Sequence, residues 1–141
     1  MHIKQLSVFL EDRSGRLTEL TRILAENDVN ITALSVAETA DYGIVRMVVG
    51  RPELAKKVLE EAGFSIGLTD VVCVNIPDKP GSLYRILQIL TEEKINIDYM
   101  YAFSNNDVAL AVIRATDMQQ VTEVLQNNRM RLLSTSDLYQ L

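Results

Sequence analysis

The sequence predicts an α+β fold that consists of two copies of one β-α-β-β-α-β unit. Two observations support this prediction. The chain repeats itself without a gap at an offset of 66 positions, as from Asp12 to Asp78, and strand-like and helix-like stretches follow one another in the same order in both copies. The identities at this offset are Val8/Val74, Asp12/Asp78, Gly15/Gly81, Leu17/Leu83, Ile23/Ile89, Leu24/Leu90, Glu26/Glu92, Asn30/Asn96, Ile31/Ile97, Asp41/Asp107, Val58/Val124 and Leu59/Leu125.

The first copy begins with a strand in which Leu6, Val8 and Leu10 share one face. Apolar residues then recur at helical spacing from Leu17 to Leu24. A second helix has proline at its start and glycine at its end, which is the usual asymmetry of helix termini. The predicted strands cover residues 3–10, 31–37, 44–49 and 64–68, and the predicted helices run from 17 to 28 and from 52 to 63.

The second copy predicts strands at 71–76, 97–103, 108–114 and 130–133, with helices at 83–90 and at about 117–127. Two hairpin-linked strand pairs joined by helices are typical of the ferredoxin-like split β-α-β. We therefore expect two such units side by side, forming a continuous antiparallel sheet of about eight strands with helices on one face. The expected domains are residues 1–68 and 69–141. The tail from Ser136 resembles residues 69–74, so we expect it to be a strand-like extension of the second domain.

The strand from Val108 to Ile113 is apolar on both faces, whereas a half-exposed antiparallel strand alternates between apolar and polar residues. Something must therefore cover its second face. The sequence favours a second copy of the chain, and thus a homodimer, although coverage by the tail would give the same pattern.

The composition limits the classes of function. The net charge of −5 argues against a nucleic-acid-binding surface, which would carry clustered lysine and arginine. The single cysteine, Cys73, lies in an apolar run, which excludes a disulfide framework and predicts a buried, reduced thiol. No apolar signal core and no stretch of about twenty apolar residues is present, so we expect a cytoplasmic protein that does not span a membrane.

The sequence does not predict an enzyme. The only histidine is His2, no motif links a nucleophile to a base, and no cluster has the spacing of metal ligands, so no cofactor or metal is expected. The RNA recognition motif has the same strand order. Its signature requires a basic residue, glycine and an aromatic residue on a central strand, and residues 43–46 lack it.

The two turns before the first helix of each copy are the candidate binding sites. They read Leu-Glu-Asp-Arg-Ser-Gly-Arg-Leu at 10–17 and Ile-Pro-Asp-Lys-Pro-Gly-Ser-Leu at 76–83, and share the skeleton Asp-x-x-Gly-x-Leu. Each turn places backbone N–H groups at a helix N-terminus, with a glycine that permits close approach. Such a position binds small anions, including the carboxylate of a free amino acid.

A β-α-β-β-α-β unit with Asp-x-x-Gly-x-Leu at its first strand-to-helix turn, followed by Asn-Ile at the second strand, resembles the ACT domain. This small module senses amino acids in metabolic regulation, and the resemblance covers both copies and essentially the whole chain. It implies that two units pair, and that an effector amino acid binds between the turn of one unit and the early second strand of the other. No catalytic domain accompanies the two copies, so the chain resembles a stand-alone tandem ACT protein.

The resemblance and the turn chemistry together give the predicted ligand-binding residues. In the first copy these are Asp12, Arg13, Ser14, Gly15, Arg16, Leu17, Asn30 and Ile31. In the second copy they are Asp78, Lys79, Pro80, Gly81, Ser82, Leu83, Asn96 and Ile97.

Several of these residues have a second, purely structural interpretation. Asp12 and Asp78 either contact the ligand or fold the turn by accepting backbone N–H groups. Asn30 and Asn96 either contact the ligand or end the preceding helix in a left-handed conformation. Leu17 and Leu83 are also predicted to be core residues. Because Pro80 replaces Ser14 and removes one N–H donor, the two turns cannot bind a ligand identically.

The second strands of the two copies differ in size of side chain. Ala33, Ser35 and Ala37 in the first copy correspond to Tyr99, Tyr101 and Phe103 in the second. The aromatic residues either wall a ligand or fill the core or a dimer interface.

We therefore predict a regulatory protein that senses a free amino acid at the interface between its two repeats. The alternative is a ligand-independent interaction module, or a regulatory subunit of an amino-acid biosynthetic enzyme, in which case a metabolic enzyme is the partner.

Overall fold

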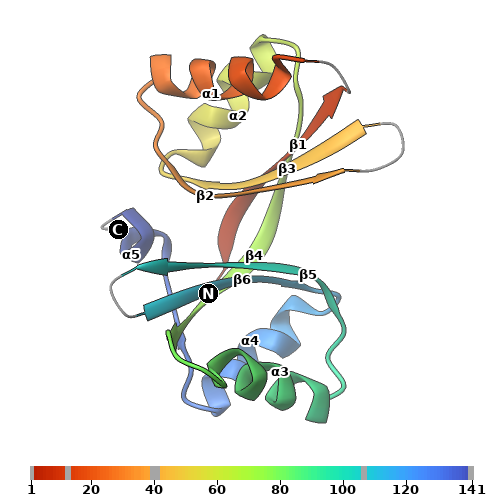
Figure 1. Cartoon of the computed structure of the whole chain (residues 1–141), viewed down its shortest axis with the longest axis vertical. Coiled ribbons are helices and arrows are strands. Elements are labelled where there is room, and N and C mark those ends of the chain that lie inside the picture. The colour runs from red at the N-terminus through yellow and green to blue at the C-terminus, as the bar shows by residue number, and fades with distance from the viewer. Residues whose placement is uncertain (1, 12–13, 39–41, 106–107, 140–141) are drawn as a thin grey trace. The chain divides into compact units, whose positions relative to one another are not determined.

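The computed structural model describes the chain except for residues 1, 12–13, 39–41, 106–107 and 140–141 (Figure 1). The chain divides into two compact units. The first unit consists of Lys4–Thr69, and the second consists of Asp70–Leu141 together with the N-terminal Met1–Ile3. Each unit is described by itself.

The first unit has two helices on one face of an antiparallel sheet (Figure 1). Its elements are β1 (Ile3–Glu11), α1 (Arg16–Glu26), β2 (Ile31–Glu38), β3 (Tyr42–Val49), α2 (Pro52–Glu61) and the beginning of β4 (Ser65–Pro77). The strand order is β2-β3-β1-β4, which is the order of a ferredoxin-like unit.

Side-chain alternation along β1 places the core of the first unit on the helical face. Leu6 and Val8 are fully buried, whereas Phe9 is 44% exposed. Leu6 pairs with Met47 and Val8 with Val45, so the inward residues of β1 and β3 lie side by side. Helix α1 adds Leu20, Ile23 and Leu24 to this core, and helix α2 adds Ala55 and Leu59.

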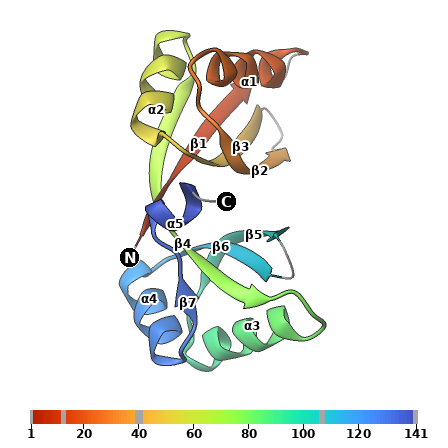
Figure 2. The same cartoon turned by 90° about the vertical axis from the view of Figure 1, so that its left-hand side faces the viewer.

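The second unit repeats this arrangement with α3 (Ser82–Glu92), β5 (Ile97–Asn105), β6 (Val108–Ala115), α4 (Met118–Asn127), β7 (Arg131–Leu132) and the additional α5 (Thr135–Tyr139). Its strands follow the order β7-β4-β6-β5. Figure 2 shows α3 and α4 on one face of the sheet and α5 on the other. The core lies between the sheet and the first two helices, with Ile86, Leu90, Val121 and Leu125 fully or almost fully buried.

The predicted α+β fold class is confirmed, with seven strands among the described residues where about eight were expected. The difference lies in β4, because residues 65–77 form one uninterrupted strand where the sequence suggested separate strands at 64–68 and 71–76. No residue between them breaks an extended chain, so β4 is the last strand of the first unit and the first strand of the second. The hydrogen-bonded order is β2-β3-β1-β4-β6-β5, with β7 beside β4.

The prediction of a strand-like tail is wrong, because Thr135–Tyr139 forms helix α5. Ser134 and Asp137 cap this helix reciprocally, since the Ser134 N–H donates to Asp137 Oδ2 at 2.8 Å and the Asp137 N–H donates to Ser134 Oγ at 3.3 Å. The backbone and hydroxyl hydrogen bonds from Ser134 lower the pKa of the Asp137 carboxyl. The stretch at 69–74, which the tail resembles, has no such cap.

Both faces of β6 are buried within the single chain. Ala111 and Ile113 belong to the core beneath the helices, and Leu110 and Val112 on the other face are 2% and 0% exposed. The apolar pattern of this strand therefore does not by itself require a second copy, and the homodimer stays a prediction. Cys73, which pairs with Val112, is buried as expected, and desolvation raises the pKa of its thiol to about 12.

Candidate functional site

The two predicted turns have the same backbone conformation at the glycine that begins the helix. Gly15 precedes α1 with φ 89° and ψ −7°, and Gly81 precedes α3 with φ 90° and ψ −14°. A Cβ atom at either position would meet nothing within 4 Å, so the left-handed conformation, and not a lack of space, requires glycine. Among the described residues, neither helix has a side-chain hydrogen bond at its N-cap. N–H groups of the first turn are therefore available, apart from the Ser82 N–H, which donates to the Lys79 carbonyl.

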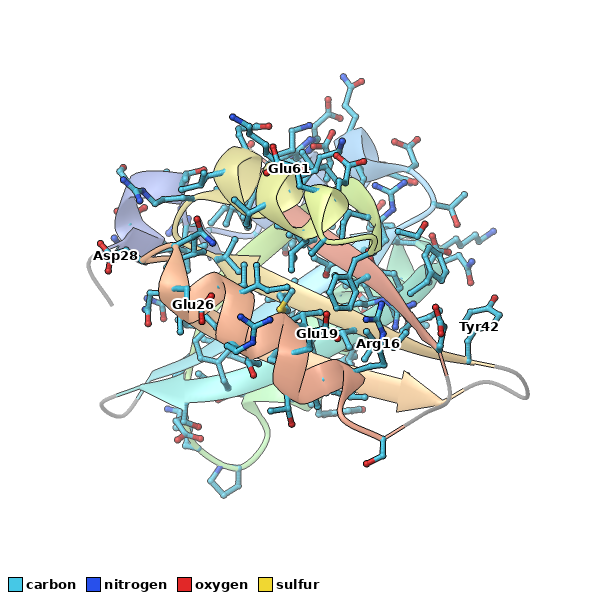
Figure 3. All side chains as sticks on the ribbon, turned by 90° about the horizontal axis from the view of Figure 1, so that it is seen from above. Arg16, Glu19, Glu26, Asp28, Tyr42 and Glu61 are labelled. Carbon is cyan, nitrogen blue, oxygen red and sulfur yellow. The ribbon has the colours of Figure 1, made fainter. Side chains whose placement is uncertain are left out.

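The first turn is closed by a buried arginine. Arg16 is 8% exposed, and its guanidinium lies over the ring of Phe64, with Cζ 4.1 Å from the ring centroid. Nη1 donates to Glu19 Oε2 at 2.9 Å, whereas Nε has no hydrogen-bond partner among the described residues (Figure 3). A pocket of about 290 Å³ remains beside it, between the end of β1, Tyr42 and Gly63. Asp12 and Arg13, predicted for this site, lie outside the described residues, and Ser14 is exposed.

The second turn has an open pocket at the equivalent place, which we call the basic pocket. Its volume is about 560 Å³, and it is lined by residues 76–77 and 79–82, by Arg85 and by the connection at 128–130. Equivalent positions line both pockets, since Leu10, Arg16 and Gly63 correspond to Ile76, Ser82 and Arg129 at the 66-residue offset. The short Ser82 side chain therefore leaves open the space that Arg16 fills in the first unit.

A smaller pocket of about 220 Å³, which we call the front pocket, also lies at the second turn and shares Ile76, Pro77, Lys79 and Ser82 with the basic pocket. Asp78, Lys79, Ser82 and Leu83 line it from the turn, and the residues at 102–104 and Ala109 line it from the sheet. Phe103, one of the three aromatic residues that the sequence singled out, contributes to this wall, but Tyr99 and Tyr101 do not. The structure thus brings four predicted turn residues together with one of the aromatic candidates.

Asp78 does not fold its turn by the hydrogen bonds that one interpretation proposed. Its carboxylate makes no hydrogen bond with the residues that the structure describes, and the turn is closed by the Lys79 N–H to the Pro77 carbonyl at 3.1 Å and the Ser82 N–H to the Lys79 carbonyl at 3.2 Å. The exposed carboxylate is therefore free to meet a ligand in the front pocket.

Asn30 and Asn96 lie at the other end of the helix from the turn of their own unit. Helix α1 has 11 residues, which at 1.5 Å per residue separates the turn from Asn30 by about 16 Å. The left-handed interpretation of the two asparagines is wrong, because Asp28 and Lys94 take that conformation, with φ 57° each. One unit alone therefore does not bring the two parts of the predicted site together.

Both copies have an irregularity just after the asparagine, which sequence reasoning missed. The register shifts between Ile31 and Ala33 in the pairing of β2, and between Ile97 and Tyr99 in the pairing of β5. A bulge of this kind reorients neighbouring side chains and is frequent beside binding sites. No local residue pattern marks it, apart from the Asn-Ile repeat itself.

Leu17 and Leu83 are 37% and 43% exposed, so their prediction as core residues is wrong. The helix begins one residue earlier than expected in both units, which turns Arg16 and not Leu17 towards the inside of the first unit. Sequence reasoning also missed Arg85 and Arg129, which line the basic pocket. Both were visible as charged residues at positions where the first copy has Glu19 and Gly63.

The described part of the chain contains no group of three or more His, Cys, Asp or Glu residues that could hold a metal ion. Among the same residues, no helix has the length and apolar character needed to cross a membrane.

The fold and the two glycine turns define a tandem protein with two ferredoxin-like units. The sequence matches the family described as ACT domain pair over residues 1–141, and the chain belongs to that family. The resemblance predicted from the turns is therefore confirmed. A search of curated proteins found no match.

Solved structures show the same architecture. The crystal structure of protein BT0572 from Bacteroides thetaiotaomicron is 48% identical, with a TM-score of 0.95, and the match covers 100% of this chain and 98% of that chain. The ligand-free regulatory subunit of aspartate kinase from Thermus thermophilus is 16% identical, with a TM-score of 0.67 and coverage of 89% and 91%. The regulatory subunit of aspartate kinase from Thermus flavus is 15% identical, with a TM-score of 0.59 and coverage of 89% and 92%. The last two show likeness of fold.

Proposed function

We propose that this chain is a regulatory protein, without catalytic activity of its own, that binds a free amino acid at its glycine turns. The observation that carries the proposal is the identical left-handed glycine at the start of α1 and α3, in a chain that belongs to the ACT domain pair family. This conformation leaves N–H groups of the first helical turn available for a carboxylate.

The front pocket supplies complementary groups for the whole amino acid. The carboxylate of the amino acid accepts hydrogen bonds from the first turn of α3, and the ammonium of the amino acid lies towards the exposed carboxylate of Asp78. Leu83 and Phe103 offer apolar surface to the amino-acid side chain. Pro80 lacks an N–H group, so the second turn has one donor fewer than the first, and the two turns differ in affinity.

The remaining parts of the site stay predictions. By the family resemblance, the ligand also contacts an Asn-Ile segment at the beginning of a second strand, and a second unit must supply it because Asn96 is far from the turn of its own unit. The named functions of the Thermus structures support a regulatory role, and we extend the proposal to a cytoplasmic homodimer that regulates a metabolic enzyme.

A thermal-melt screen of the full chain against the twenty amino acids at about 1 mM tests the proposal. An amino acid with a dissociation constant near 10 µM raises the free energy of unfolding by about 2.7 kcal/mol, which corresponds to several degrees at this chain length. We expect Asp78→Asn and Asn96→Ala to reduce the shift, and Glu92→Gln, which makes the same change of charge at an exposed residue of α3, to keep it.

Absence of a shift with all twenty amino acids would contradict the proposal. The same protein would then be used to capture a catalytic partner, because a ligand-independent regulatory subunit retains that interaction. A selective shift that persists in both variants would place the amino acid at another site.

A further inference from the structure

The basic pocket gathers three cations, of which only Lys79 also lines the front pocket. Lys79 comes from the turn, Arg85 from α3 and Arg129 from the connection after α4, and all three line the same space of about 560 Å³. No aspartate or glutamate lines it, although the chain as a whole has 19 acidic and 14 basic residues. None of the three cations forms an ion pair with the residues that the structure describes.

We infer that the basic pocket binds a small anion carrying at least two negative charges. Like charges that converge without a counter-ion repel one another, so an anion seated between them gains from all three. Arginine side chains bind carboxylate and phosphoryl oxygens in a bidentate way, and lysine adds a point charge. A free amino acid with an uncharged side chain has no net charge at neutral pH and does not match such a pocket, whereas aspartate and glutamate carry two carboxylates and count among the dicarboxylates. This inference goes beyond the proposed function and does not depend on it.

At the equivalent position of the first unit, the chain supplies both the cation and the carboxylates. There the Arg16 guanidinium occupies the space and pairs with Glu19, and Glu11 lines the remaining cavity. In the second unit the corresponding residues are Ser82, Arg85 and Pro77. The internal cation has been removed, and both carboxylates are gone, one of them replaced by a cation. Each difference favours an anion from outside.

The backbone at Arg129 supports the same inference. Arg129 has φ 61°, a left-handed conformation that glycine adopts without strain, and the equivalent Gly63 has φ 93°. An arginine at this position adds strain that a glycine would avoid, and its side chain lines the basic pocket. The arginine therefore contributes a charge at a place where the fold alone favours glycine.

The pocket also limits the size and chemistry of the anion. Its volume exceeds that of an inorganic phosphate, and Ile76, Pro77 and Met130 form an apolar wall for the uncharged part of a metabolite. The shared chemistry is a compact group with two negative charges, which either a phosphoryl group or a dicarboxylate provides.

Titration of the ¹⁵N-labelled full chain with sodium phosphate, sodium pyrophosphate and sodium succinate tests the inference, with sodium chloride keeping the ionic strength constant. We expect saturable amide shifts confined to residues 79–85 and 128–130, with a dissociation constant of about 1 mM or below for at least one probe. Binding of phosphate or pyrophosphate alone identifies a phosphoryl group, and binding of succinate alone identifies a dicarboxylate.

Two variants decide whether the basic pocket is responsible. Arg129→Gly suits the backbone, and we expect it to weaken binding at least about tenfold. The matched control is Lys94→Gly, which also replaces a cation at φ 57° by glycine but does not line the pocket, and it should bind like the unmodified chain. The double variant Ser82→Arg/Arg85→Glu reproduces the internal pair of the first unit and should abolish binding.

Absence of saturable shifts with all three probes would overturn the inference, as would equal loss of binding in Arg129→Gly and Lys94→Gly. Asp78→Asn separates this inference from the proposed function, because it should impair the amino-acid response and leave dianion binding intact. Arg129→Gly should have the opposite pattern.

Discussion

The turns that precede the first helix of each repeat have the same backbone conformation but different surrounding side chains. The φ angles of Gly15 and Gly81 are 89° and 90°, so the path of the chain into the helix is the same. Behind the first turn, Arg16 is packed over Phe64 and paired with Glu19. Behind the second turn, the equivalent residues leave a pocket of about 560 Å³ lined by cations.

This difference shows which residues determine the fold and which are free to determine function. The glycine, the inward residues of the strands and the apolar face of the helix are required by the backbone and the core in both repeats. The residues at positions 16 and 19, and their equivalents 82 and 85, are not required by the fold. They form an ion pair in the first unit and line the open basic pocket in the second. We therefore expect substitutions at Arg16 and Ser82 to change the free energy of unfolding by different amounts. Substitutions at Gly15 and Gly81 should change it by the same amount.

The largest expected contrast is between Arg16→Ala and Ser82→Ala. Loss of Arg16 removes a desolvated cation–π contact and the packing of its side chain, which together lower the free energy of unfolding by about 2–3 kcal/mol. Ser82 lies beside an open pocket, so Ser82→Ala should change the free energy by less than about 0.5 kcal/mol. Urea unfolding of both variants measures the contrast.

Arg16→Met separates packing from charge in that result. Methionine covers the Phe64 ring, removes the unpartnered Nε and leaves Glu19 able to reach water, since its side chain is 37% exposed. We expect a cost below about 1 kcal/mol, because methionine keeps an apolar contact with the ring and the lost ion pair, whose Glu19 partner is 37% exposed, contributes little. Equal costs for Arg16→Met and Arg16→Ala would show that the charge, and not the packing, closes the first turn.

The two glycine positions, in contrast, are expected to respond equally. Gly15→Ala and Gly81→Ala should each lower the free energy of unfolding by about 1–2 kcal/mol, because an L-residue is strained in the left-handed conformation. Neither new methyl group meets another atom within 4 Å, so the cost is conformational in both units. Gly67→Ala is the control, since Gly67 has an ordinary strand conformation and equal space, and it should be neutral or stabilising. Clearly unequal costs at Gly15 and Gly81 would show that the two turns are not equivalent.

The sequence predicted the features that depend on local pattern. The alternation of Leu6, Val8 and Leu10 predicted the inward face of β1, and the 66-residue repeat predicted two copies of one unit. The two glycine turns predicted where the helices begin to within one residue. These features follow from residues close together in the chain, where backbone sterics and periodicity decide the outcome.

Features that depend on distant residues were not predictable in this way. Burial of Arg16 requires Phe64, which is far along the chain, and arginine alone suggests an exposed position. The basic pocket requires Arg85 and Arg129 to converge from separate elements. The tail was predicted to be a strand from its resemblance to residues 69–74, whereas the reciprocal cap between Ser134 and Asp137 favours a helix.

The smallest expected effect is that of Arg129→Gly on the free energy of unfolding, to which backbone strain and unfolded-state entropy contribute with opposite signs. Arg129→Gly removes left-handed strain of about 1–2 kcal/mol but adds unfolded-state entropy worth about 0.4–1 kcal/mol. We therefore expect a net stabilisation of about 0.5 kcal/mol, measurable by urea unfolding. Lys94→Gly, at φ 57°, should gain a similar amount. Destabilisation by Arg129→Gly alone would mean that the Arg129 side chain supports the fold, because the backbone change is shared with Lys94→Gly.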